Sequence, residues 1–191
     1  MTAPAPAPMR VPAALARHVV VGMADCKVSR TAEETLVTYA LGSCLGIVVH
    51  DPAAGVAGLL HVMLPTSTID EAKARANPWM FVDTGVPRLF KACYELGARK
   101  ERMTVTVAGG AHAGAADAED SFQIGKRNVL ALRKLLWKNG VMIHAEDTGG
   151  HQRSRTMSVS VASGAVSLRT NGATTPLVRP DGPARTGRES P

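Results

Sequence analysis

A cysteine and a histidine on either side of one turn are the side chains in this sequence best suited to nucleophilic chemistry. Cys44 and His61 lie in the segment 38–65, TYALGSCLGIVVHDPAAGVAGLLHVMLP, where two apolar runs flank the turn sequence DPAAG. This pattern predicts a β-hairpin. With a four-residue loop at 51–54, Cys44 faces His61 across the strand pair, where opposed Cβ atoms lie about 4.5–5.5 Å apart. A slip of one residue would move one of the two side chains to the other face.

Cysteine beside histidine is the minimal pair for nucleophilic catalysis. A thiol with an ordinary pKa of about 8.5 is mostly protonated at neutral pH, and a neighbouring imidazolium favours the reactive thiolate. Gly42 and Ser43 precede the cysteine, and glycine permits a sharp turn that leaves backbone N–H groups free to hold an oxyanion. The hydroxyl of Thr38, one strand earlier, could orient the imidazole as the third member of a triad.

The same residues also have purely structural explanations, which the sequence leaves open. Cysteine is among the most buried residue types, so a single cysteine more often packs in a core than reacts. His61 lies within the apolar run GLLHVML and Thr38 within an ordinary strand pattern. Cys26, at the end of a strand, and Cys93, on an apolar helix face, are predicted to be structural.

The other chemistry-bearing residues form no recognisable motif. The remaining histidines show no metal-ligand spacing with cysteines or acids, so the sequence predicts no metal and no cofactor. Glycine pairs at 109–110 and 149–150 belong to no nucleotide-binding pattern and are predicted to be turns. The segment LGSC lacks the G-x-S-x-G elbow of serine hydrolases.

Short apolar runs separated by turn residues predict a series of strands. These are His18–Met23, Thr35–Leu41, Cys44–His50, Val56–Leu64, Met103–Ala108, Val141–Ala145, Arg155–Val161 and Ala165–Thr170. Apolar residues spaced by three and four predict helices over Val86–Leu96 and Lys126–Asn139. The expected fold class is therefore α+β, with mostly antiparallel β-sheets and two or three packed helices in a single domain.

Composition is typical of a single domain in a reducing compartment. A chain of 191 residues that is 45% hydrophobic can bury a core without disulfides. Three cysteines are unlike a secreted disulfide framework. No run reaches the ~18 apolar residues of a membrane span, and the proline-interrupted start lacks a signal-peptide core. We therefore expect a cytoplasmic protein that does not insert into membranes.

Proline and charge both point to the two ends of the chain. Eight of the twelve prolines lie in residues 1–17 and 172–191. These segments are predicted to be flexible tails around one domain at 18–171. The net charge of +6 falls to +3 without the tails. Because aromatic residues are few and none is set among basic residues, nucleic acid is not an expected partner.

Residues 41–52, LGSCLGIVVHDP, and 61–65, HVMLP, resemble the chemoreceptor glutamine deamidases of bacterial chemotaxis, the CheD family. The resemblance continues in order through FVDTGVP, VAGGA, IGKRNV, AEDTGG and RSRT, and it covers most of residues 18–170. His50, His112 and Lys126 depart from the pattern expected of the family.

The resemblance implies a cysteine hydrolase that converts receptor glutamines to glutamates through a thioester, releasing ammonia without a metal or cofactor. The family's catalytic Thr, Cys and His match Thr38, Cys44 and His61. The implied substrate is the cytoplasmic helices of chemoreceptors, and members of the family can bind a CheC-type chemotaxis phosphatase. Two alternatives stay open: a receptor glutamyl methylesterase with the same triad, and a non-catalytic regulatory binder of the phosphatase.

Overall fold

The computed structural model describes residues 17–112 and 122–179. Within these residues ten strands form two five-stranded sheets, accompanied by three α-helices. The outer sheet has the strand order β1 (Arg17–Val20), β3 (Glu34–Leu41), β8 (Arg155–Ser160), β9 (Val166–Thr170) and β10 (Ala173–Val178). The central sheet has the order β2 (Asp25–Ser29), β5 (Val56–Val62), β4 (Leu45–Asp51), β6 (Thr104–Gly109) and β7 (Ile143–Thr148). The pairs β1–β3 and β6–β7 are parallel, and the other pairs are antiparallel.

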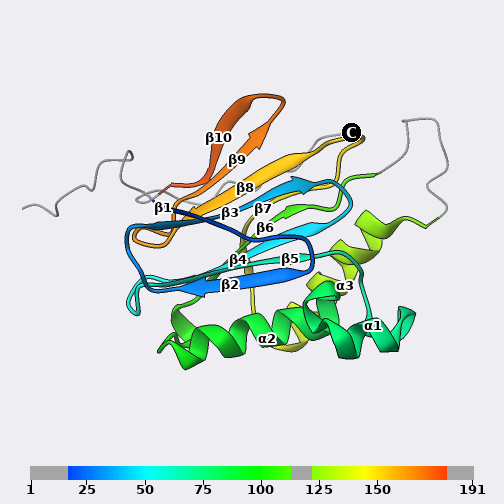
Figure 1. Ribbon diagram of the computed structural model, residues 1–191, viewed down its shortest axis with the longest axis horizontal. Coiled ribbons are helices and arrows are strands. Elements are labelled where there is room, and N and C mark those ends of the chain that lie inside the picture. The colour runs from blue at the N-terminus through cyan, green and yellow to red at the C-terminus, as the bar shows by residue number, and fades with distance from the viewer. Residues whose placement is uncertain (1–16, 113–121, 180–191) are drawn as a thin grey trace, which may run out of the picture.

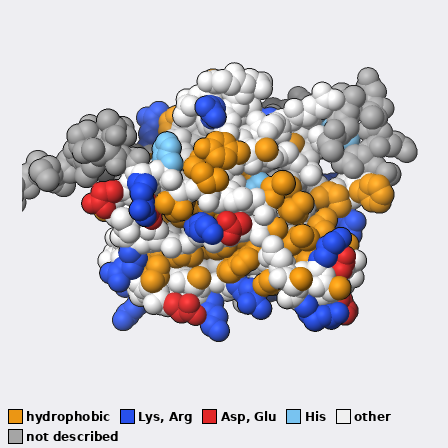
Figure 2. Space-filling view, in the orientation of Figure 1, with side chains coloured by type: hydrophobic (Ala, Val, Ile, Leu, Met, Phe, Trp, Pro, Cys, Tyr) orange, Lys and Arg blue, Asp and Glu red, His pale blue; other side chains and the backbone are white. Residues whose placement is uncertain are grey.

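Figure 1 shows the resulting three layers, with the outer sheet above, the central sheet in the middle and the helices below. The helices are α1 (Glu71–Ala76), α2 (Val82–Glu95) and α3 (Ile124–Lys138). Over the helix layer, Lys and Arg side chains lie among acidic and apolar ones on the face shown in Figure 2. These basic side chains are scattered over this face and form no single basic patch there.

Each space between layers holds its own hydrophobic core. One core, between the two sheets, includes Leu36, Leu59 and Met157. The other, between the central sheet and the helices, includes Leu60 and Leu89. Because successive side chains of a strand point to opposite faces, β5 sends Leu59 to one core and Leu60 to the other. Burial on both faces explains why the central strands read as nearly continuous apolar runs.

The structure confirms the predicted fold class: α+β, mostly antiparallel, with three helices in one domain. Strands β2 and β10 and helix α1 have no counterpart among the predicted elements. The predicted boundary at residue 171 is wrong, because β10 lies within the segment expected to be a flexible tail. It pairs with β9 at the sheet edge, where the missing N–H of Pro176 is tolerated and only Leu177 is buried. Residues 1–16 and 180–191 of the predicted tails lie outside the described residues.

The predicted hairpin forms from β4 and β5, but its register differs from the predicted one by two residues. Asp51 pairs with Val56, so the loop is 52–55 and His61 lies opposite Gly46, not opposite Cys44. Because side chains alternate with a period of two, this shift leaves the two candidate residues on the same face of the sheet.

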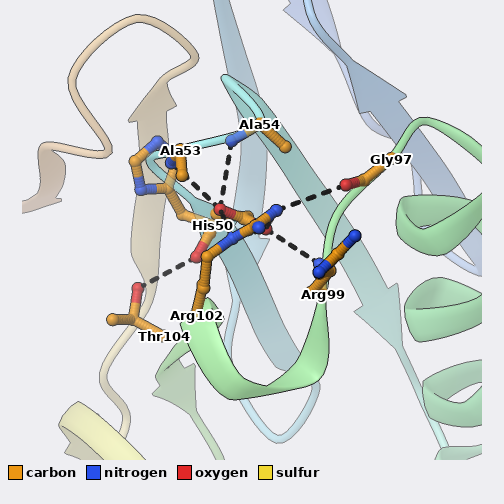
Figure 3. A network of polar contacts seen from close by, with 8 residues as sticks. His50, Ala53, Ala54, Gly97, Arg99, Arg102 and Thr104 are labelled. Atoms are coloured by element: carbon orange, nitrogen blue, oxygen red, sulfur yellow. Dashed lines mark hydrogen bonds and ion pairs between the residues drawn. The ribbon is translucent and has the colours of Figure 1, made fainter.

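The carboxylate of Asp51 explains this register (Figure 3). It is completely buried and accepts hydrogen bonds from the backbone N–H groups of Ala53, Ala54 and Arg99, at 3.0, 3.1 and 2.8 Å. It also forms an ion pair with Arg102 at 2.8 Å. These contacts, led by the hydrogen bonds from Arg102, hold the pKa of Asp51 well below its ordinary value. Asp51 is therefore fixed as the last residue of its strand and is not part of the loop.

Candidate active site

The candidate residues lie where the chain crosses from the outer sheet to the central sheet. Strand β3 ends at Leu41 and β4 begins at Leu45, so residues 42–44 form the crossing itself. Cys44 is partly exposed and packs against the core between the sheets. His61, near the end of β5, is buried at the same end of the molecule.

Thr38 and His61 are joined across the two sheets. Thr38 Oγ1 lies 2.8 Å from His61 Nδ1 and 2.8 Å from the carbonyl oxygen of Val21. A carbonyl can only accept, so the hydroxyl donates its single hydrogen to Val21 and accepts from Nδ1–H of the imidazole. Neutral His61 therefore carries its proton on Nδ1 and has a lone pair on Nε2, which is the tautomer that a general base needs.

The thiol and the imidazole are neighbours on one face of the central sheet. Gly46 is paired with His61, and Cys44 lies two residues before Gly46. Such diagonal positions in an antiparallel pair are about 7–8 Å apart. Nε2 of His61 is buried and has no hydrogen-bond partner among the described residues, so Sγ of Cys44 is not bonded to it in this structure.

Burial shifts the pKa values of the two groups in opposite directions. Desolvation raises the pKa of the Cys44 thiol above its ordinary value of 9.0 and lowers the pKa of His61 below 6.5. At neutral pH the site therefore holds a thiol and a neutral imidazole. Burial raises the pKa of Cys26 and of Cys93 to about 12, which makes these two thiols far less reactive.

The carbonyl groups of the crossing segment, residues 42–44, are fixed by hydrogen bonds from residues 110–111 and from α3. Three carbonyl oxygens in succession accept hydrogen bonds: Gly42 from Ala111 N–H at 2.8 Å, Ser43 from Asn128 Nδ2 at 3.0 Å and Cys44 from Gly110 N–H at 2.8 Å. No described peptide bond is cis, and in a trans peptide the N–H points opposite to the C=O. The N–H groups of Ser43 and Cys44 consequently point away from the segments that bind these carbonyls.

The glycine pair at 109–110, predicted only as a turn, packs directly against the carbonyl of Cys44. Both residues have positive φ angles, 115° and 66°. A Cβ on Gly109 would lie 2.1 Å from the carbonyl oxygen of Cys44, so no larger residue fits there. The sequence shows the glycine pair, but it does not show that the pair lies against the cysteine.

A partly buried ion pair joins the two sheets where the chain crosses from β7 to β8. Arg155 is fully buried, lies opposite Leu41 in the outer sheet and binds Asp147 of the central sheet at 2.8 Å. Its Nη2 also donates to the carbonyl of Gly149 at 2.8 Å, and Arg153 binds the same carboxylate at 3.2 Å. The sequence alone predicts no role for these residues.

The protein is thus an α+β domain that brings a cysteine, a histidine and a threonine together beside the space between its two sheets. Comparison with known proteins identifies the family. The family model described as CheD chemotactic sensory transduction matches residues 63–170. The chain belongs to the CheD family, as its sequence motifs predicted.

Several curated relatives are similar over most of their length. A protein named probable chemoreceptor glutamine deamidase CheD from Solibacter usitatus is 47% identical over 161 residues, or 84% of this chain and 94% of the relative. One from Syntrophus aciditrophicus is 47% identical over 154 residues, or 81% and 94%. One from Thermococcus kodakarensis is 38% identical over 152 residues, or 80% and 92%.

Among solved structures, protein NMB0706 of Neisseria meningitidis matches with a TM-score of 0.41 and 13% identity, over 71% of this chain and 62% of the other. None of the helices in the described parts of the chain is long and apolar enough to cross a membrane.

Proposed function

We propose that this protein deamidates glutamine side chains of bacterial chemoreceptors, with Cys44 as nucleophile, His61 as general base and Thr38 as the residue that orients His61. The family and the names of its relatives support the substrate and the reaction. The observation that carries the residue assignment is the hydrogen bond between Thr38 and His61 Nδ1, because it leaves Nε2 free to take a proton.

In the first half of the reaction, Nε2 of His61 takes the proton of Cys44 Sγ while the sulfur attacks the amide carbon of glutamine. Because both groups start neutral, the proton moves as the carbon–sulfur bond forms. The catalytic hydrogen bond between Sγ and Nε2 forms as an electrophile, the substrate amide or an alkylating reagent, approaches the sulfur, as is common when the free enzyme shows a longer separation. The backbone N–H groups of Ser43 and Cys44, after the turn at Gly42, are the donors for the oxyanion.

In the second half, the carbon–nitrogen bond breaks and the imidazolium of His61 donates its proton to the departing nitrogen, which leaves as ammonia. A thioester with Cys44 remains. His61 then takes a proton from water as the hydroxide adds to the thioester carbon. The carbon–sulfur bond breaks, and the imidazolium of His61 returns its proton to the sulfur, which regenerates the thiol and leaves a carboxylic acid that ionises to glutamate. One water is consumed for each ammonia released.

The test is incubation of the full chain with a receptor cytoplasmic fragment, followed by mass spectrometry of the receptor glutamines. We expect Gln-to-Glu conversion by the wild-type protein and by Cys26→Ala, and none by Cys44→Ala. Full conversion by Cys44→Ala would exclude the assignment. The same fragment carrying glutamyl methyl esters tests the alternative, since a methylesterase would release methanol from it.

The role of Thr38 is tested by two substitutions, one that replaces its hydroxyl by a methyl group and one that removes its methyl group and keeps the hydroxyl. Thr38→Val removes the bond to His61 Nδ1, and we expect kcat to fall about tenfold, the equivalent of one neutral hydrogen bond. Thr38→Ser retains the hydroxyl and should stay close to wild type. Equal kcat in the two variants would show that the hydroxyl does not orient His61.

The location follows from the proposed reaction. The substrate segments of chemoreceptors are cytoplasmic, so we propose a cytoplasmic location for this protein as well. Binding of a CheC-type phosphatase stays a prediction, and pull-down of such a phosphatase with the wild-type chain would test it.

A further inference from the structure

Asn128 on α3 is a completely buried polar residue that the mechanism above does not use. Its Nδ2 donates two hydrogen bonds of 3.0 Å, one to the carbonyl oxygen of Ser43 and one to that of Met63. Both partners are carbonyls, which can only accept, so the NH₂ group and not Oδ1 must face them. Both hydrogens of the amide are thus committed to these two segments.

The two carbonyls belong to the two segments that carry the candidate nucleophile and base. Ser43 directly precedes Cys44, and Met63 follows His61 by two residues. Gly46 and His61 pair further along the hairpin, but Cys44 itself lies before the first residue of β4. The amide of Asn128, on α3, therefore directly links the crossing segment 42–44, here called the Cys44 turn, to Met63 directly after β5.

The close approach of α3 makes this link possible. A Cβ on Gly125 would lie 2.5 Å from the carbonyl oxygens of both Gly110 and Ala111. The first turn of α3 is thus in direct contact with the segment that donates to the carbonyls of Gly42 and Cys44. At this distance the short side chain of Asn128, three residues after Gly125, reaches backbone atoms of the crossing segment before β4 and of the residue that follows β5.

We propose that Asn128 is a positioning residue for the reaction: its amide sets the separation and relative orientation of Cys44 and His61. The inference rests on the proposed function for its catalytic readout. Thr38 holds the imidazole from the outer sheet. Asn128, from the helix layer, binds the carbonyl of Ser43 next to Cys44 and that of Met63, two residues after His61. Attack geometry is sensitive to such placement, because a misplacement of 1 Å can cost about 100-fold in rate.

A purely structural role for Asn128 predicts a different result. Loss of two buried hydrogen bonds would then lower the thermal midpoint without changing the chemistry of the molecules that stay folded. The test therefore uses kinetics at a temperature well below the midpoint, where every variant is folded by circular dichroism. Asn128→Leu has nearly the same size and no donor. Asn128→Ser is smaller, leaves room for a bridging water, and serves if the leucine variant does not fold.

Asn139 offers a matched control on the same helix. Its Nδ2 also donates to a backbone carbonyl, that of Leu135 at 2.8 Å, but at the exposed end of α3 far along the helix from Asn128. Asn139→Leu removes an amide of the same type without touching the Cys44 turn or β5. We expect its kcat and its thiol reactivity to equal those of the wild-type protein.

The first measurement is the rate at which iodoacetamide alkylates Cys44 between pH 6 and 9, followed by mass spectrometry of the full chain. This readout needs no receptor. We expect His61→Ala to slow the reaction at neutral pH, and Asn128→Leu or Asn128→Ser to slow it toward the His61→Ala rate. The second measurement is deamidation of the receptor fragment, for which we expect kcat to fall about 10- to 100-fold with KM nearly unchanged.

If a folded Asn128 variant has the alkylation rate and the kcat of the wild-type protein, the inference is wrong, whichever of the two substitutions is used. If the wild-type protein alkylates in a His61- and Asn128-dependent manner but leaves receptor glutamines intact, the proposed substrate is wrong and the positioning role stands. If it deamidates the receptor and the Asn128 variants do so equally well, the proposed function stands and the positioning role is wrong.

Discussion

Burial acts on Cys44 and His61 so as to keep both of them uncharged. The thiol loses solvation on ionising and the imidazole loses it on protonation, so the pKa of one is raised and that of the other lowered. A resting ion pair would need a charged partner that offsets this cost, and the hydroxyl of Thr38 carries no charge. We therefore expect the thiolate to form during attack on the substrate and not before it.

Thiolate absorbance at 240 nm measures the resting state directly. The difference spectrum between the wild-type protein and Cys44→Ser should be nearly flat at pH 7 and should rise with a midpoint above pH 9.0, because burial raises the pKa of Cys44 above that value. Cys26 and Cys93, with pKa values of about 12, contribute nothing in this range. A thiolate signal from Cys44 at pH 7 would show instead that the site rests as a thiolate–imidazolium pair.

At the scale of elements, the register of the β4–β5 hairpin sets how Cys44 and His61 lie relative to each other, and the contacts of Asp51 fix that register. We expect Asp51→Asn to lower the free energy of unfolding at pH 7 by roughly 2 kcal/mol or more, because a charged acceptor of three backbone N–H groups and of Arg102 becomes a neutral amide with only one accepting oxygen. Urea unfolding measures the effect. Glu71→Gln, at an exposed ion pair with Arg75, is the control and should change stability little.

The pH dependence of this effect has a definite sign. The folded protein holds the pKa of Asp51 below its ordinary value of 3.8, so the stabilisation is complete above that pH and is lost as pH falls through it. The difference between wild type and Asp51→Asn should therefore be constant from pH 5 to 7 and should shrink below about pH 4. A difference that persists unchanged in acid would contradict the role of the carboxylate charge.

The hairpin also shows which features local sequence patterns can predict and which they cannot. Its apolar runs and turn residues predict the strand pair and place Cys44 and His61 on one face, since period-two alternation is a local property. The register depends on Asp51, whose partners Arg99 and Arg102 lie about fifty residues away in sequence. No local pattern contains that contact, so the predicted loop is displaced by one residue and the pairing by two.

The missed elements have the same physical cause. Strand β10 has one buried side chain, Leu177, and owes its conformation to pairing with β9, which a turn- and proline-rich sequence does not reveal. Asn128 looks like an ordinary polar position on a basic helix. Its importance appears only when α3 is laid against the Cys44 turn, a contact between residues 85 positions apart.

At the scale of the whole molecule, the proposed chemistry belongs to one of the two spaces between layers. Cys44, His61 and Thr38 all face the space between the sheets, whereas the space between the central sheet and the helices holds apolar side chains and Cys93. Each of these two spaces is bordered by one glycine of the hairpin. Gly46, paired with His61, faces the outer sheet, and Gly58 on the adjacent strand β5 faces α2.

Alanine at these two glycines should therefore separate stability from catalysis. A Cβ at Gly46 would lie 2.7 Å from the Leu41 side chain and 2.9 Å from Met157 Sδ, and a Cβ at Gly58 would lie 2.6 Å from the Leu89 side chain and 3.0 Å from Cys93 Sγ. Each methyl group overfills its core, so we expect both variants to lose about 1–3 kcal/mol of stability in urea unfolding.

Only Gly46→Ala should also lower kcat, by about tenfold or more, because it separates the sheets beside the bond between His61 and Thr38. Gly58→Ala displaces α2 and leaves that bond in place, so its kcat on the receptor fragment should equal the wild-type value well below its melting temperature. Similar losses of kcat in the two variants would mean that the site responds to general loosening of the central sheet. A loss of kcat in Gly46→Ala alone would show that catalysis depends on how the two sheets pack against each other.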